Sequence, residues 1–301
     1  MKKHGSGSPL MRRNALTASL FLLPSFLFLA AFVFWPMIYS VVLSLYEWNP
    51  LKDPVFVGGA NYTALMQDDL WWTSLKQTLY YIVLNVPVIV LCSVGLALLV
   101  VSLGKRLPRL ANFFKGLFFI PTMMSLVATA IVWLWLLSTN YGALNSLLGS
   151  FGIQAVEWLS NTKMSMISIV IVTVWRWAGY YMVIFIAGLQ SIPPHYYEAA
   201  EIDGASAWRK FLHITLPQLY PTIFFVALMS IIGSFQEFDL FYMLTLGGPR
   251  TSTYVTGFYM WKTGFSNLKM GYASAMSTVL FVIMLIFTVI QLRINNKKEV
   301  A

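Results

Sequence analysis

Long apolar runs alternate with short polar stretches along the whole chain. Each of six runs reaches the roughly 20 residues that an α-helix needs to cross the hydrocarbon core of a bilayer. Only helices and closed barrels satisfy their backbone polar groups inside lipid. The pattern therefore predicts an all-α integral membrane protein with six transmembrane helices. The runs cover residues 16–45, 78–101, 116–137, 165–189, 220–246 and 272–292.

The polar stretches at the two ends of the chain predict an N-terminal and a C-terminal tail that flank a single membrane domain in the sequence. Residues 1–14 are basic and contain Gly and Ser, and residues 294–301 are also basic. A cleaved signal peptide is the alternative for the amino end. The run at 16–45 is too long for a typical signal core and no small-residue cleavage site follows it. We therefore expect a retained first span and one domain over residues 15–293.

Composition agrees with a membrane protein and adds an orientation. Of the 301 residues, 58% are hydrophobic and only 10% are charged, against roughly 25% in soluble domains. Thirteen of the 20 Lys and Arg residues fall in the two tails and in the polar stretches after spans two and four, and six fall in the other stretches. Positive charge concentrates on the cytoplasmic side, which predicts cytosolic termini and accounts for the net charge of +9 without nucleic acid. The single cysteine, Cys92, excludes an intrachain disulfide, and we expect it to pack in a span.

The polar stretch at residues 192–219 has a helix–turn–helix pattern. A helical pattern covers residues 194–202, and Gly204 then provides a break because glycine tolerates backbone angles that other residues resist. A second helical pattern covers residues 206–214, and Pro217 marks the entry into the next apolar run. We expect two short helices outside the bilayer, on the cytoplasmic side.

This stretch resembles the EAA loop of membrane subunits from ATP-binding-cassette importers. The resemblance rests on the spacing of Glu198-Ala199-Ala200, Asp203-Gly204-Ala205 and Leu216-Pro217. It extends to Ala187–Pro193 and Leu244–Pro249, which look like the carbohydrate-uptake branch. The chain is similar to the first permease subunit of maltose-type and glycerol-3-phosphate-type systems, which implies a type I importer permease fold.

The resemblance also implies a set of partners. A second homologous permease would complete the pathway, two ATPase subunits would bind the loop, and an extracytoplasmic solute-binding protein would deliver a sugar. The eight residues Glu198, Ala199, Ala200, Asp203, Gly204, Ala205, Leu216 and Pro217 would couple the permease to the ATPase. The implied location is the bacterial cytoplasmic membrane, with the chain passing through it several times.

The sequence contains no signature of bond chemistry. It has no GxxxxGK[ST] phosphate-binding loop, catalytic triad or metal cluster. We expect this chain to bind no cofactor, with ATP and Mg²⁺ held by the partner ATPase. His195 and His213 are expected to be solvated positions.

Span four carries the candidate substrate path. Arg176 lies within this span, where a charge is costly and usually faces protein or water. It is either a lining or gate residue or part of a fixed ion pair with Glu237 or Asp239. The family resemblance places sugar-contacting positions near Thr173, Trp177, Tyr180, Phe235, Gln236 and Glu237. The alternative for the aromatic residues is contact with lipid or with neighbouring helices.

Together, the pattern and the resemblance predict a permease subunit of an ATP-driven, binding-protein-dependent importer for a sugar or sugar-like solute. An ion-coupled secondary transporter is the main alternative, but the EAA-like loop has no role there and no internal repeat is clear. A membrane-embedded enzyme would need reactive groups at matched depth, and the sequence shows none. Which solute is carried is left open.

Overall fold

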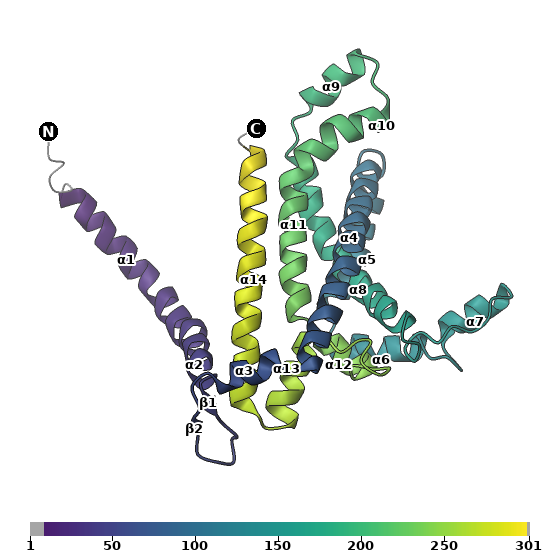
Figure 1. Cartoon of the computed structure of the whole chain (residues 1–301). Coiled ribbons are helices and arrows are strands. Elements are labelled where there is room, and N and C mark those ends of the chain that lie inside the picture. Colours follow the sequence, from purple (N-terminus) through teal and green to yellow (C-terminus); the bar gives the residue numbers. More distant parts are fainter. Residues whose placement is uncertain (1–8, 300–301) are drawn as a thin grey trace. The chain divides into compact units, whose positions relative to one another are not determined.

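The computed structural model describes the backbone of residues 9–299 and the side chains of residues 17–294. Helices dominate this part of the chain (Figure 1). It divides into two units, Met1–Gln67 with Thr263–Phe281, and Asp68–Lys262 with Val282–Ala301.

The first unit combines apolar helices with a small hairpin. Helix α1 (Pro9–Leu29) continues through the π-helical turn Ala30–Phe34 into α2 (Trp35–Leu43). Strands β1 (Tyr46–Glu47) and β2 (Val55–Phe56) pair antiparallel, and α3 (Ala60–Met66) follows. The first part of α14 (Met270–Glu299) belongs to this unit and follows the π-helical segment Lys262–Ser266.

Gly271 allows the hairpin to approach the start of α14. The Met270 amide donates a hydrogen bond of 3.0 Å to the carbonyl of Trp48. A Cβ at Gly271 would overlap the carbonyl of Tyr46. Asn61 holds the same strand from the other side, because its amide Nδ2 donates to the carbonyls of Ser44 and Tyr46 at 2.8 and 2.9 Å.

The second unit is organised around α4 (Asp69–Gly104), α8 (Met164–Gln190) and α11 (Leu216–Gln236), which pack on one another, and α5 (Pro108–Met123), which packs on α4 and α8 (Figure 1). Asp68 begins α4 by accepting hydrogen bonds from the amides of Leu70 and Trp71, as an N-cap residue does. Helix α4 packs against α8 and α11, and α8 also packs against α5.

Shorter helices complete this unit and, together with α4 and α8, build the apolar cluster around Tyr81 and Phe241. One cluster surrounds Tyr81 and Phe241, and the other surrounds Phe185 and Leu219. All four side chains are buried. The shorter helices are α6 (Leu126–Leu136), α7 (Ala143–Ser150), α9 (His195–Ile202), α10 (Ala207–Lys210), α12 (Asp239–Thr245) and α13 (Thr256–Trp261).

The described residues contain five helices that are long and apolar enough to cross a membrane, or six if one bent pair counts as a span. This agrees with the predicted six-span, all-α class. The spans cover Thr17–Leu43, Asp69–Gly104, Met164–Gln190, Ala207–Gln236 and Met270–Ile294, with Pro108–Met123 and Leu126–Leu136 as the bent pair.

The third expected span, residues 116–137, is not one helix. It is formed by α5 and α6, which meet at 100°. Met124 and Ser125 have extended backbone angles at the break, with ψ of 143° and 136°. Pro121 precedes the break and removes one helical hydrogen bond, which weakens the last turn of α5.

The second and fifth spans also differ from their expected limits. Helix α4 begins at Asp69, nine residues before the expected start, because Asp68 caps it. Helix α11 ends at Gln236, since Glu237 is extended with ψ of 121°, and α12 is a separate helix. The expected stop at Gly247 is present, because Leu246 and Gly247 have φ of 51° and 80°. Cys92 is exposed rather than packed, so the expectation for its side chain was wrong.

Candidate functional site

The turn between α9 and α10 has the hydrogen-bond pattern of a Schellman helix end. Gly204 has φ of +69°, a left-handed conformation that favours glycine. Its amide donates to the carbonyl of Glu201 at 3.1 Å, and the amide of Ala205 donates to the carbonyl of Ala200 at 2.8 Å. These two bonds satisfy carbonyls that a helix end leaves open. The predicted break at Gly204 is confirmed, and the DGA sequence explains its geometry.

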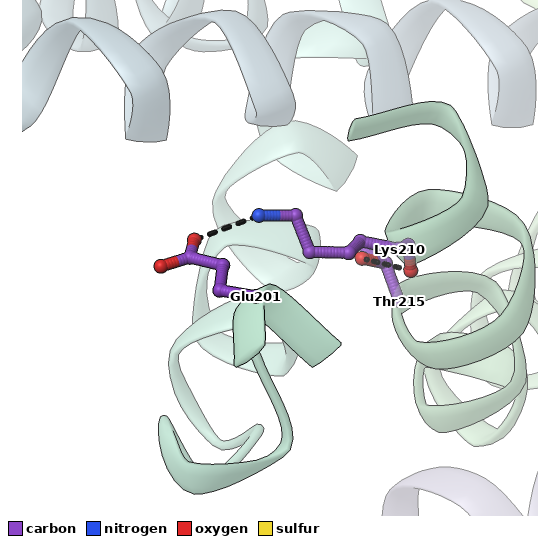
Figure 2. A network of polar contacts seen from close by, with 3 residues as sticks. All are labelled: Glu201, Lys210 and Thr215. Atoms are coloured by element: carbon purple, nitrogen blue, oxygen red, sulfur yellow. Dashed lines mark hydrogen bonds and ion pairs between the residues drawn. The ribbon is translucent and has the colours of Figure 1, made fainter. Parts of the chain in front are cut away.

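Polar side chains then hold the two arms of this turn together (Figure 2). Lys210 Nζ donates to Glu201 Oε1 at 2.7 Å, joining α10 to α9. The hydroxyls of Tyr197 and Thr215 lie 3.0 Å apart, and Thr215 also donates to the carbonyl of Lys210 at 3.4 Å. At the start of α10, the Ser206 hydroxyl accepts from the Arg209 amide. The segment at residues 192–219, which we name the connecting element, is therefore a cross-linked unit.

The second arm of the connecting element differs from the expected helix that stops before Pro217. Helix α10 passes into the π-helical turn Phe211–Thr215 and then into α11 without a break. Pro217 therefore lies inside the helical path, at the start of α11. The Leu216 amide before this proline donates to the carbonyl of Phe211, five residues earlier, which is the spacing of a π turn.

The connecting element presents apolar side chains on its surface. Ile202 is 87% exposed and Trp208 is 67% exposed, and Trp208 stacks on Phe211 at 5.6 Å. Isolated exposed apolar residues are ordinary, but several on one short element indicate a contact surface. The eight predicted coupling residues all lie on this element, and none of them is fully buried. His195 and His213 are exposed, as expected.

The charge of Lys210 changes the acidity of Glu201. The hydrogen bond from Lys210, followed by its positive charge, lowers the pKa of the Glu201 carboxyl below its ordinary value. The charge of Lys105 acts in the same direction with a smaller effect. Glu201 therefore stays ionised at neutral pH, and its carboxylate remains available to Lys210.

A cavity of about 290 Å³ lies among α4, α8 and α11. Tyr81 donates a hydrogen bond to Thr173 across it at 3.0 Å, and Trp177 meets Tyr180 edge-on at 5.8 Å. Five predicted substrate-path residues line this cavity together. They are Thr173, Trp177, Tyr180, Gln236 and Glu237.

Two predicted substrate-path residues do not line the cavity. Phe235 is only 1% exposed and packs against Phe287, with ring centroids 5.7 Å apart. Arg176 lies with its guanidinium 5.4 Å from the centre of the Trp177 ring, and its Nε is buried without a hydrogen-bond partner. Neither Glu237 nor Asp239 comes within 4.0 Å of Arg176, so the alternative of a fixed ion pair is not observed.

Sequence reasoning missed the contribution of α4 to this cavity. Tyr81, Asn85 and Ile89 recur at intervals of four and line it along one helix face. Asn85 Nδ2 donates to Ser234 Oγ at 3.1 Å, while Asn85 Oδ1 is buried without a partner. An amide inside the apolar run at 78–101 was the available signal. Ser230, Gly233 and Ser234 of α11 complete the polar wall.

The sequence matches a known protein family over most of its length. Residues 62–300 match the family described as "binding-protein-dependent transport system inner membrane component". The chain belongs to this family. It is therefore a membrane-embedded permease subunit of a binding-protein-dependent transport system, as the EAA-like stretch indicated.

Individual relatives extend over almost the whole permease. It is 35% identical to a probable ABC transporter permease protein of Pyrococcus horikoshii, over 93% of this chain and 96% of that protein. It is 32% identical to the lactose transport system permease protein LacF of Rhizobium radiobacter, over 95% and 96% of the two chains. A crystal structure of a bacterial ABC transporter for import of the acidic polysaccharide alginate contains a chain with the same fold, at a TM-score of 0.81 and 23% identity, covering 95% of this chain and 97% of that one.

Proposed function

We propose that this permease forms half of the translocation pathway of an ATP-driven sugar importer and is driven through the connecting element. A second, homologous permease supplies the other half, and two ATPase subunits bind the connecting elements. ATP and Mg²⁺ belong to those ATPases, and this chain contributes no cofactor. The family description, with its dependence on a binding protein, supports this assembly.

One observation carries the proposal: the connecting element joins α8 and α11, two of the three helices that line the cavity. Helix α8 enters the element at Gln190, and α11 leaves it at Leu216. The two helices are packed closely at this end, since a Cβ at Gly188 would lie 2.5 Å from Thr222 Oγ1 and Leu219 is fully buried. A displacement of the element therefore moves both α8 and α11, and with them the walls of the cavity.

The cross-links within the element give it the stiffness that this role requires. The Schellman turn and the Glu201–Lys210 ion pair join its two arms. A partner that changes shape on ATP binding shifts the permease only through contacts that differ between its two states. The exposed side chains of Ile202 and Trp208 supply apolar contact area for such a partner.

The lining of the cavity fits a sugar or sugar-like solute. Trp177 and Tyr180 offer aromatic faces, and Asn85, Gln236 and Glu237 offer hydrogen-bonding groups beside them. Asn85 Oδ1 is buried beside the cavity without a hydrogen-bond partner, so it would need a side-chain rotation to accept from a solute hydroxyl. The lactose permease among the relatives supports the same solute class.

The proposal places the connecting element and both termini in the cytoplasm and the whole chain in the bacterial cytoplasmic membrane. The concentration of Lys and Arg in the tails and in the stretches beside α5 and α10 supports this orientation. An extracytoplasmic binding protein then meets the opposite face.

A matched pair of glycine variants tests the coupling role. Gly204→Asp alters the turn, while Gly152→Asp places the same side chain at another glycine with positive φ, 74°, outside the element. A Cβ meets no atom within 4 Å at either position, so both substitutions strain the backbone at a positive φ without causing a steric clash. Both variants are assembled with their native partner subunits in proteoliposomes, and sugar uptake and ATP hydrolysis are measured.

We expect Gly204→Asp to abolish uptake and to disconnect ATP hydrolysis from the solute-loaded binding protein, with Gly152→Asp close to wild type. Normal uptake by Gly204→Asp would overturn the proposed coupling role. Uptake that persists without ATP but requires an ion gradient would favour the secondary-transporter alternative.

A further inference from the structure

A second cavity, of about 350 Å³, lies where α4 ends and α5 begins. Lys105 and Lys115 line it, together with the amides Asn112 and Gln190. Val101 and Ile186 contribute apolar walls. Ile186 and Gln190 at the end of α8 also line the cavity. The turn between α4 and α5 lies at the same end of this unit as α9 and α10 (Figure 1). The second cavity is therefore separate from the cavity among α4, α8 and α11.

The two lysines of this cavity are not neutralised by neighbouring acids. Among the residues whose side chains the structure describes, neither Lys105 nor Lys115 has a carboxylate oxygen within 4.0 Å. Glu201 lies close enough for the charge of Lys105 to lower its pKa, but its hydrogen bond is made with Lys210. Two ammonium groups and two amides thus surround one space and favour an anion.

The same cavity is also partly apolar, which selects the kind of anion. Val101 belongs to the last apolar residues of the second span, and Lys105 follows one turn later. The cavity therefore lies at the level where lipid headgroups meet hydrocarbon. Basic pockets between membrane helices at this level suit anionic headgroups. A free small anion would gain nothing from the valine and isoleucine walls.

We propose that this cavity binds the phosphate headgroup of an anionic phospholipid, with Lys105 and Lys115 contacting the phosphate and the start of the acyl chains lying against Val101 and Ile186. Asn112 and Gln190 donate further hydrogen bonds to the headgroup. A bound phosphate competes with Glu201 for the charge of Lys105, and it contacts Gln190 at the point where α8 enters the connecting element. Its effect on transport rests on the proposed function, whereas the binding itself does not.

Paired charge variants distinguish this site from general surface attraction. Lys105→Gln/Lys115→Gln removes two charges that line the cavity. Arg106→Gln/Arg109→Gln removes two charges from the same segment that do not line it. The purified transporter complex is titrated with phosphatidylglycerol and with phosphatidylcholine of the same acyl chains, and bound lipid is counted by native mass spectrometry. Thermal unfolding midpoints check that both variants are folded.

We expect wild type to retain phosphatidylglycerol in preference to phosphatidylcholine. The lysine variant should bind phosphatidylglycerol about tenfold more weakly, and the arginine variant less than twofold more weakly. Equal losses in both variants, or no preference between the lipids, would overturn the proposal. Displacement of the lipid by millimolar inorganic phosphate would also overturn it, since the site would then select a small anion.

Transport assays separate this inference from the proposed function. In proteoliposomes with and without phosphatidylglycerol, we expect the lipid to change the ATPase rate of wild type and not that of the lysine variant. If the lipid binds as expected but the ATPase rate does not respond to it in any variant, the site stands and its link to the connecting element fails.

Discussion

Glu201 and Lys210 meet across a turn whose other residues are mostly exposed, so their bond is one of few contacts that join α9 to α10. Protonation of Glu201 removes the negative charge of its carboxylate and so weakens the ion pair with Lys210. The pKa of Glu201 is lowered in the folded chain, so the contribution of this pair to stability is present above the ordinary glutamate pKa. It is lost as the pH falls through the lowered value.

We predict that Lys210→Met raises the pKa of Glu201 toward its ordinary value, because both the hydrogen bond and the nearest positive charge are removed. Lys105→Met should raise it by a smaller amount. Carboxyl NMR titration of selectively labelled Glu201 measures both changes. An unchanged midpoint in Lys210→Met would show that the pair does not form in the membrane-embedded protein.

Substitution of Trp177 tests most directly whether the cavity among α4, α8 and α11 is the substrate path. Trp177 lines the cavity beside Tyr180, whereas Trp135 is 56% exposed on α6 and lines no part of that cavity. We predict that Trp177→Ala reduces sugar uptake by tenfold or more, since stacking area is lost, and that Trp135→Ala stays within twofold. Co-purification of the ATPase with both variants serves as the control for assembly. Equal uptake by the two variants would show that Trp177 serves helix packing and does not contact the solute.

At the level of elements, the close crossing of α5 and α8 depends on one glycine. A Cβ at Gly179 would overlap the carbonyl group of Phe118, so the two helices approach to backbone contact. The adjacent hydrogen bond from Thr122 Oγ1 to the carbonyl of Arg176, at 2.7 Å, fixes the same crossing. This contact precedes the 100° bend between α5 and α6 and holds α5 in place before it.

We predict that Gly179→Ala destabilises the protein by about 1–3 kcal/mol, the usual cost of overpacking a tight contact. Gly95→Ala on α4 is the matched control, because no atom lies within 4 Å of its Cβ position and alanine favours a helix. Thermal unfolding in detergent should show a lower midpoint for Gly179→Ala only. A similar midpoint for both variants would mean that α5 and α8 separate at little cost.

The sequence was sufficient to locate the membrane helices but not their breaks. Among residues 123–126 only Ser125 is polar, and one serine in an apolar run is too weak a signal in the hydrophobicity to locate the bend between α5 and α6. Gly204 was different, because a glycine between two polar helical patterns marks a left-handed turn in the sequence itself. A turn that depends on one residue type, as at Gly204, can be predicted from the sequence. The direction of an apolar helix cannot, because it depends on the helices that pack against it.

The same reason limits what could be predicted for the cavity. Trp177 and Tyr180 are three residues apart on one helix, so their shared face follows from the helical period. Phe235 and Gln236 are adjacent at the end of α11, and the extended Glu237 that follows breaks the period. Only one of these two neighbours reaches the cavity, and which one it is depends on packing against Phe287.

At the scale of the whole molecule, orientation in the membrane follows from the distribution of positive charge. Six crossings would return the chain to its starting side, and most Lys and Arg residues fall in the segments expected on that side. The proposed orientation places the connecting element and the lysine-lined cavity at the end of α4 on the cytoplasmic face. An inverted orientation would separate the element from ATP and remove the basis of the coupling mechanism.

Single-cysteine labelling tests this orientation in a Cys92→Ser background. Ser206 lies in the connecting element and Ser150 ends α7 in the stretch after α6, and both are exposed. We predict that a membrane-impermeant maleimide labels Ser150→Cys in intact spheroplasts, and labels Ser206→Cys only after permeabilisation. The Cys92→Ser parent should stay unlabelled in both conditions, because it contains no cysteine. Labelling of Ser206→Cys from outside would show that the topology is the reverse of the proposed one. The ATPase would then have no access to the element that joins α8 to α11.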